Sequence, residues 1–174
     1  VEAKVIGQQI LSKDVKLIEV FAPEIARTAK PGQFVNVQVS KQAAPLLRRP
    51  FGVAGIDYIS GTFKMISRMM GEGTQILAEL CSGDVISIIG PLGHGFDLTA
   101  KHPLLVGGGL GLAPLLYLAQ SFLKKNIPYL LSSRPMKKKR LFCKSSYAPL
   151  YCEEQRSRLP KISRPAQRRY CGAK

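Results

Sequence analysis

The sequence contains no apolar run long enough to cross a membrane. Its uninterrupted hydrophobic stretches fall well short of the roughly 20 residues that a membrane-spanning helix requires. The first residues also lack the basic, apolar and small-residue order of a secretory signal. We therefore expect a cytoplasmic protein with no membrane partner.

Closely spaced cysteines are also missing. The four cysteines, Cys81, Cys143, Cys152 and Cys171, include no C-x-x-C pair. This spacing argues against a disulfide scaffold and against a zinc site, both of which need cysteines at short, regular intervals. We expect free thiols.

Acidic residues are scarce, and their scarcity is local. The chain has 26 Lys and Arg against 11 Asp and Glu, but residues 1–132 carry 13 against 9 and residues 133–174 carry 13 against 2. The net charge of +15 therefore belongs mostly to the end of the chain. A basic segment of this kind either binds polyanions or stays solvated. We favour solvation and regard nucleic acid as an unlikely partner, with a basic nucleic-acid-binding protein kept as an alternative function.

The first hundred residues are predicted to form short strands separated by turns. The chain has 174 residues and is 45% hydrophobic, which suffices for a real core. One helix, near residues 73–80, is expected among these strands. The pattern favours a small antiparallel, Greek-key-like β-barrel or a sandwich over residues 1–100. The predicted strands lie at 15–23, 34–40, 51–57, 62–70 and 85–90.

A different pattern follows residue 100. An apolar strand at 103–106, a glycine loop, a helix at 113–125 and a second apolar strand at 127–133 predict a βαβ unit over residues 101–133. Such a unit needs a parallel sheet, and two strands are few for one. Residues 134–174 show neither helical nor strand periodicity, and we interpret them as a basic, atypical tail that is disordered or read in an altered frame.

The glycine loop is the clearest candidate binding site. Gly107, Gly108, Gly109 and Gly111 lie between a predicted strand and a predicted helix, where backbone N–H groups and the helix dipole favour a phosphate. Pro114 suits the first helical turn, where no N–H donor is needed. The alternative is a tight turn that needs glycine for its geometry alone.

A second, weaker candidate is the tetrapeptide GEGT at residues 71–74. Thr74 can cap the following helix or donate its hydroxyl to a phosphate, and Gly73 leaves room for that phosphate. An ordinary helix cap explains the same residues.

Taken together, these segments resemble the ferredoxin reductase superfamily. PGQF, RRPFG, ISR, GEGT, GPLGHGF and GGGLGLAP occur in the order and at about the spacing of that superfamily. The resemblance is closest to the electron-transfer subunits of NAD-dependent dihydroorotate dehydrogenases, and it covers residues 1 to about 132. It implies an FAD-binding β-barrel followed by a partial α/β domain for the pyridine nucleotide.

The resemblance also implies roles for individual residues. Arg49 is expected to pair with the flavin pyrophosphate, a role that suits a permanently charged, bidentate group. Pro50 and Phe51 would hold the strand against the flavin. Gly52 stands where the family commonly has serine or threonine, so only its backbone N–H is available there.

Further cofactor-binding residues follow from the same resemblance. Ile66, Ser67 and Arg68 match a second flavin-contacting strand, with Arg68 as a further cation. Gly73 and Thr74 match a phosphate clamp. The loop that receives the pyridine nucleotide supplies Gly108, Gly109, Gly111 and Pro114. Arg48 is expected to be solvated, and His94 to be a loop residue; no catalytic acid or base and no metal ligand is assigned.

The implied function is electron transfer. Such a subunit relays electrons between an FMN-containing catalytic subunit of dihydroorotate dehydrogenase and NAD in pyrimidine biosynthesis, and FAD supplies the redox chemistry. The alternatives are another ferredoxin-linked or sulfide-linked NAD(P)H flavin reductase subunit, or an inactive remnant. Members of the family that the chain resembles normally also carry a [2Fe-2S] cluster on closely spaced cysteines. The spacing of Cys143, Cys152 and Cys171 does not match that compact pattern, so we predict no cluster.

Overall fold

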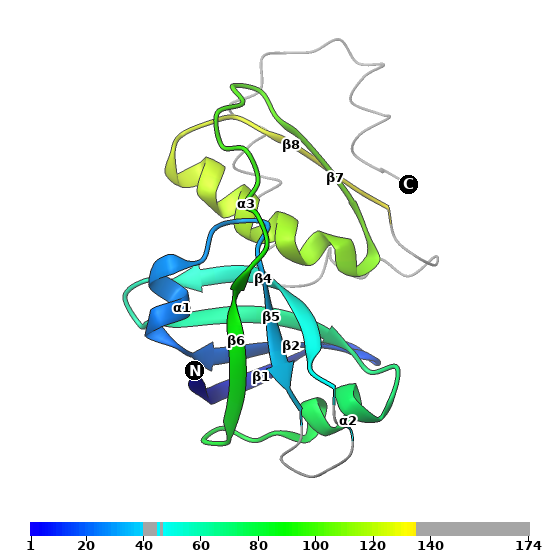
Figure 1. The fold of residues 1–174 in the computed structure, drawn as a ribbon. Helices are drawn as coiled ribbons and strands as arrows, with labels where there is room; N and C mark the ends of the chain where they lie inside the picture. Colours follow the sequence, from blue (N-terminus) through cyan, green and yellow to red (C-terminus); the bar gives the residue numbers. More distant parts are fainter. Residues whose placement is uncertain (40–44, 46, 135–174) are drawn as a thin grey trace.

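Six antiparallel strands close into a barrel in the first part of the chain (Figure 1). The structure is a computed structural model that describes residues 1–39, 45 and 47–134. The strand order around the barrel is β1-β2-β5-β4-β3-β6, which confirms the predicted antiparallel barrel. The strands are β1 (Glu2–Ser12), β2 (Val15–Phe21), β3 (Phe34–Gln38), β4 (Arg49–Asp57), β5 (Thr62–Arg68) and β6 (Val85–Leu92).

Alternating apolar residues fill the barrel. In β3, Val35 and Val37 are fully buried while their neighbours along the strand are half-buried. Phe63 and Met65 of β5 point into the same core and are also fully buried. Because successive side chains of a strand point to opposite faces, this period of two places one face of each strand inside the barrel.

Two elements of the barrel domain were not predicted. Strand β1 pairs with β2 and β6 although its sequence contains a polar Gly-Gln-Gln run, and its ladder with β2 shifts register between Val5 and Gly7. Helix α1 (Pro23–Thr28) begins with proline, whose missing N–H costs nothing there. The expectation of a single helix in this region was therefore wrong.

Helix α2 (Glu72–Glu79) lies at one end of the barrel (Figure 1). The Nε2 group of Gln8 in β1 donates hydrogen bonds to the carbonyls of Leu77 and Leu80, at 3.0 and 2.8 Å. The Lys16 ammonium in β2 donates to the carbonyl of Ala78. These three bonds satisfy carbonyls at the C-terminal end of α2 and so fix the helix relative to the barrel.

The predicted βαβ unit is present. Strand β7 (Leu104–Gly108) is followed by a 3-10 turn (Gly109–Gly111), helix α3 (Leu112–Lys124) and strand β8 (Leu130–Arg134). The two strands pair in parallel. The predicted boundary near residue 100 lies between β6 and β7, and all but the first residue of the predicted tail lies outside the described residues. None of the helices in the described part of the chain is both long and apolar enough to cross a membrane.

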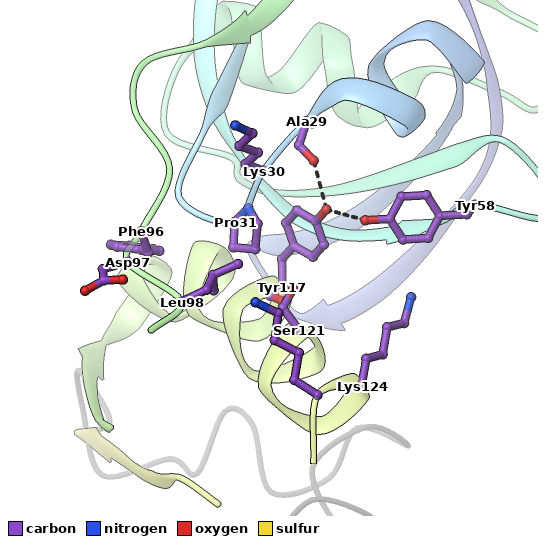
Figure 2. Close-up of a pocket in the computed structure, with 11 residues that line it drawn as sticks. Ala29, Lys30, Pro31, Tyr58, Phe96, Asp97, Leu98, Tyr117, Ser121 and Lys124 are labelled. Atoms are coloured by element: carbon purple, nitrogen blue, oxygen red, sulfur yellow. Dashed lines mark hydrogen bonds between the residues drawn. The ribbon is translucent and has the colours of Figure 1, made fainter. Parts of the chain in front are cut away.

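Helix α3 packs against the outer face of the barrel. Ala113 of α3, Ala54 of β4 and Ile66 of β5 belong to one buried apolar cluster. At the other end of the contact the buried Tyr117 hydroxyl donates to the carbonyl of Ala29 and is 2.9 Å from the Tyr58 hydroxyl (Figure 2). These contacts fix the βαβ unit to the barrel.

Candidate functional site

Arg49 and Gly73, which are far apart in the sequence, lie against each other. A Cβ atom added to Gly73 would lie 3.4 Å from Nε of Arg49 and 3.1 Å from Cγ2 of Val39. The absence of a side chain at residue 73 therefore lets the start of α2 approach the guanidinium. Two of the segments predicted to bind phosphate are thus neighbours in the fold.

No carboxylate of the described residues balances the charge of Arg49. Its Nη1 donates to the carbonyl of Leu47 at 2.7 Å, and no ion pair to it is found among the described residues. A guanidinium carries five N–H donors in a fixed fork. Arg49 therefore retains donors and a full charge for an anion at the start of α2.

Thr74 caps helix α2. Its hydroxyl oxygen accepts from the backbone N–H groups of Met70 and Gly71, at 3.0 and 3.2 Å, and its proton goes to the carbonyl of Gly71. This arrangement is the N3 half of a capping box, with the Gly71 carbonyl taking the place of an N-cap side chain. Of the two roles predicted for Thr74, the structure has it in the capping role. The first-turn N–H groups of Glu72 and Gly73 have no intrahelical acceptor.

The three predicted residues at the end of β5 have different surroundings. Ser67 is 2% exposed, and its hydroxyl has no hydrogen-bond partner among the described residues. Ile66 is buried in the apolar cluster between the barrel and α3, which also contains Ala113. Nε of Arg68 lies 3.2 Å from Oδ2 of Asp14, so its charge is balanced within the protein.

The two faces of β4 are used differently. Phe51 and Val53 point into the barrel core, so Phe51 supports the strand from inside. Gly52 lies on the outer face, where an added Cβ would lie 3.5 Å from Cδ of Pro114. Gly52 and Pro114, predicted for different cofactors, are therefore neighbours. At roughly 3.3 Å per residue, Arg49 and Gly52 are about 10 Å apart along the strand.

Glycines at the end of β7 and in the loop before α3 have two structural roles: one allows close packing and another adopts a positive φ. A Cβ at Gly107 would lie 2.7 Å from Cδ1 of Leu115, so glycine allows α3 to approach β7. Gly109 has φ of +54°, which favours glycine. Gly111 is open, with no atom within 4 Å of an added Cβ. Pro114 lies in the first turn of α3 as predicted.

One prediction about an arginine is wrong. Arg48 is not solvated: its guanidinium donates to the carbonyl and hydroxyl of Ser87, both at 2.9 Å, and to Oε1 of Gln38 at 3.1 Å. Because three acceptors on two strands hold it, Arg48 supports the barrel near the neighbouring Arg49. His94 is exposed in the loop after β6, as expected.

Sequence reasoning missed two residues of this region. Val39 packs against Gly73, and Asp14 neutralises Arg68. Asp14 could have been found from strand register, because Val15 pairs with Arg68 across β2 and β5. Val39 has no comparable signal, since nothing in the sequence places the end of β3 beside α2.

The cysteine predictions are only partly described by the structure. Cys81 is an exposed free thiol. Cys143, Cys152 and Cys171 lie outside the described residues, so the absence of an iron–sulfur cluster stays a prediction.

The chain is similar in sequence to known proteins. A curated relative from Bacillus cereus (strain B4264), "Dihydroorotate dehydrogenase B (NAD(+)), electron transfer subunit", is 36% identical over 127 residues, which is 71% of this chain and 49% of the relative. The chain thus spans about half the length of the curated relatives it matches.

Solved structures share the fold. An NADH-dependent reduced ferredoxin-NADP oxidoreductase is 26% identical with a TM-score of 0.72, and the match covers 85% of this chain and 53% of that one. Phthalate dioxygenase reductase is 18% identical with a TM-score of 0.70, covering 90% and 49%; at that identity only the fold is shared. The sequence model for the oxidoreductase FAD-binding domain matches residues 2–96, so the chain belongs to that family of ferredoxin-reductase-like, FAD-binding domains.

Proposed function

We propose that the chain binds FAD along β4 and acts as the FAD-carrying part of an electron-transfer subunit. The observation that carries this proposal is the contact between the unbalanced Arg49 guanidinium and Gly73 at the start of α2. Arg49 is the donor for the diphosphate, because a guanidinium makes paired hydrogen bonds to phosphate oxygens. The first-turn N–H groups of α2 add further donors and the positive end of the helix dipole.

The residues present fit an FAD molecule. The buried Ser67 Oγ has no partner within the part of the chain that the structure describes, which is costly unless a ligand or water completes its hydrogen bonding. Gly73 keeps open the space that a side chain would fill beside Arg49. Both observations support a bound group between the end of β5 and the start of α2.

The ring system of the flavin is proposed to lie toward Gly52 on the outer face of β4. Gly52 offers its backbone N–H and no side chain, and Pro114 flanks it from α3. Pro50 precedes it on the same face, and Phe51 fixes the strand by packing into the barrel core. When bound, FAD supplies the redox chemistry, while the chain binds it, orients it and limits its exposure to water.

A pyridine nucleotide is proposed at the loop formed by Gly108, Gly109 and Gly111. The loop follows a parallel strand and precedes α3, the arrangement in which backbone N–H groups receive a diphosphate. The contact between Pro114 and Gly52 would place this nucleotide beside the flavin. NAD is the proposed nucleotide, by similarity to the electron transfer subunits named above.

The same relatives support a proposal for the partner. We propose that the whole protein delivers electrons between NAD and an FMN-containing catalytic subunit of a dihydroorotate dehydrogenase. The support is the 36% identity to the Bacillus cereus subunit. A second candidate, a ferredoxin-linked NAD(P)H reductase subunit, is favoured by the 26% identity to the reduced ferredoxin-NADP oxidoreductase.

The absorption spectrum of the purified protein tests FAD binding. We expect oxidised-flavin bands, about one flavin per chain, and release of FAD rather than FMN on heating. Reduction by dihydroorotate in the presence of a dihydroorotate dehydrogenase catalytic subunit then separates the two candidate functions. A protein that neither purifies with FAD nor takes it up would contradict the proposal.

A further inference from the structure

A hollow of about 520 Å³ lies between the barrel and α3 (Figure 2). It is formed by the end of α1, the β4–β5 hairpin, the segment after β6 and the last turns of α3. Its lining shares no residue with the sites proposed for FAD or the pyridine nucleotide. The volume lies within the range of small-molecule sites, which often occur where two units of a protein meet.

The charged lining of the hollow is mainly positive. Lys30, Lys124 and Lys125 line it, together with the single carboxylate of Asp97. None of the three lysines forms an ion pair among the described residues. The Thr99 hydroxyl donates its one proton to the Asp97 carboxylate, with both carboxylate oxygens in reach, and the Thr99 backbone N–H donates to Oδ1. The lining therefore has more positive than negative charge, which favours an anion.

Aromatic and apolar groups form the rest of the hollow. Phe96 is 43% exposed and Tyr58 is 52% exposed, so both residues keep a surface for a ligand. Nζ of Lys124 lies 4.5 Å from the centre of the Tyr58 ring. A cation held over a ring beside further apolar surface suits a ligand that has both a negative charge and a planar body.

The Tyr117 hydroxyl in the lining of the hollow is held by hydrogen bonds and is uncharged. The hydroxyl of Tyr117 lies between the Ala29 carbonyl and the Tyr58 hydroxyl (Figure 2). Burial, with the Tyr58 hydrogen bond, raises the pKa of Tyr117 well above its ordinary value, so this hydroxyl stays protonated. It therefore adds no negative charge that would oppose an anion.

We propose that this hollow is a further binding site, for a small organic anion in which a carboxylate or phosphate is attached to a planar ring. The negative group lies with Lys124 and Lys125, and the ring packs beside Phe96. The site is independent of the proposed flavin and nucleotide sites, because it uses none of their residues.

The probes that test this site separate charge from ring. The protein is first saturated with FAD and then titrated with benzoate, phenyl phosphate, benzyl alcohol or acetate, while ¹⁵N–¹H NMR follows the backbone amides. We expect saturable shifts of the amides of Tyr58, Phe96 and Ser121 with at least one of the two charged ring compounds. Saturation by benzoate indicates a carboxylate site, and saturation by phenyl phosphate indicates a phosphate site. Benzyl alcohol lacks the charge and acetate lacks the ring, so neither should saturate the site.

Variants of exposed lysines complete the test. The double variant Lys124→Gln/Lys125→Gln should raise the dissociation constant of the bound probe by about fivefold, the size expected for removing two exposed charges. The matched control is Lys13→Gln, which removes an exposed charge from the β1–β2 turn and should leave binding unchanged. The proposal is overturned if no probe saturates, if acetate binds as well as benzoate, or if the double variant binds as tightly as Lys13→Gln.

Discussion

The barrel and the βαβ unit bury their sheets in different ways. The barrel closes on itself, so every one of its strands has two paired neighbours. Among the described residues, α3 covers one face of the parallel pair of β7 and β8. Leu105 faces α3 and is 5% exposed, whereas Leu104 and Val106 on the other face are 55% and 67% exposed. A parallel sheet is normally covered on both faces.

This difference indicates which contacts stabilise each of the two units. The barrel has its own core, and the βαβ unit is held largely by the packing of α3 on β4 and by the Tyr117 hydrogen bonds. The proposed FAD site is built mainly on the barrel and α2, with Pro114 as the contribution from the βαβ unit. We therefore expect FAD binding to depend strongly on the barrel and weakly on the βαβ unit.

Two core phenylalanines give the largest expected effects. Phe63→Ala in the barrel should lower the free energy of unfolding by about 3–5 kcal/mol and reduce FAD binding with it. Phe122→Ala, equally buried under β7, should loosen the βαβ unit and leave FAD binding nearly unchanged. Denaturant unfolding, hydrogen exchange of α3 and flavin content measure these effects. Equal losses of flavin in both variants would show that the units are not independent in this way.

The tyrosines at the junction should give a smaller effect. Tyr117→Phe leaves the buried Ala29 carbonyl without its donor and should cost about 1–3 kcal/mol. Tyr58→Phe should cost about 1 kcal/mol or less, because the half-exposed Tyr58 hydroxyl can be replaced by water. Thermal unfolding of both variants makes the comparison. A larger loss for Tyr58→Phe would contradict this description of the junction.

Gly73 tests the contact between α2 and Arg49 with little change in stability. In Gly73→Ala the added methyl lies 3.1 Å from Val39, yet alanine favours the helix by about 1 kcal/mol, so the two effects on stability oppose each other. We expect FAD affinity to fall a few-fold as the guanidinium is displaced. Gly7→Ala is the matched control, because Gly7 lies outside the proposed binding residues and its methyl meets no atom within 4 Å. Flavin fluorescence titration of both variants decides the point, and equal affinities would count against the contact.

The smallest expected effect is a pH dependence in the segment that joins the two units. The hydroxyl and backbone N–H of Thr99 hold the pKa of Asp97 below its ordinary value of 3.8. A lowered pKa in the folded state means that this contribution is full above pH 3.8 and is lost as the pH falls through the folded pKa. Unfolding of the wild-type protein and of Asp97→Asn at pH 5 and pH 3 should therefore differ more at pH 5. An equal difference at both values would contradict the prediction.

Local patterns in the sequence predict much of this fold. Val35 and Val37 alternate with polar residues, so their strand is evident from the sequence, and the glycine loop before an apolar helix indicates the βαβ unit. Strand β1 could not be predicted in the same way, because its Gly-Gln-Gln run breaks the alternation and its pairing with β2 and β6 is decided by barrel closure.

The site is less predictable than the fold. The resemblance selects Arg49 and Gly73 separately, but their contact depends on how α2 lies at the end of the barrel. The sequence also does not distinguish Arg48 from Arg49. Arg48 is adjacent to Arg49 in the sequence and chemically identical, yet it precedes β4 and its side chain bonds to Ser87 and Gln38. Only tertiary structure separates the structural arginine from the one available to a cofactor.

The affinity of two arginine variants for FAD tests the central claim most directly. Arg49→Ala removes the proposed diphosphate ligand, and Arg27→Ala removes an exposed arginine from the last turn of α1. Hydrogen bonds to charged groups contribute about 1.5–3 kcal/mol, so the dissociation constant of FAD should rise by about tenfold or more in Arg49→Ala. Arg27→Ala should bind FAD as the wild-type protein does. If Arg49→Ala folds normally and binds FAD as tightly as Arg27→Ala, then Arg49 is not the diphosphate ligand and the proposed site is wrong.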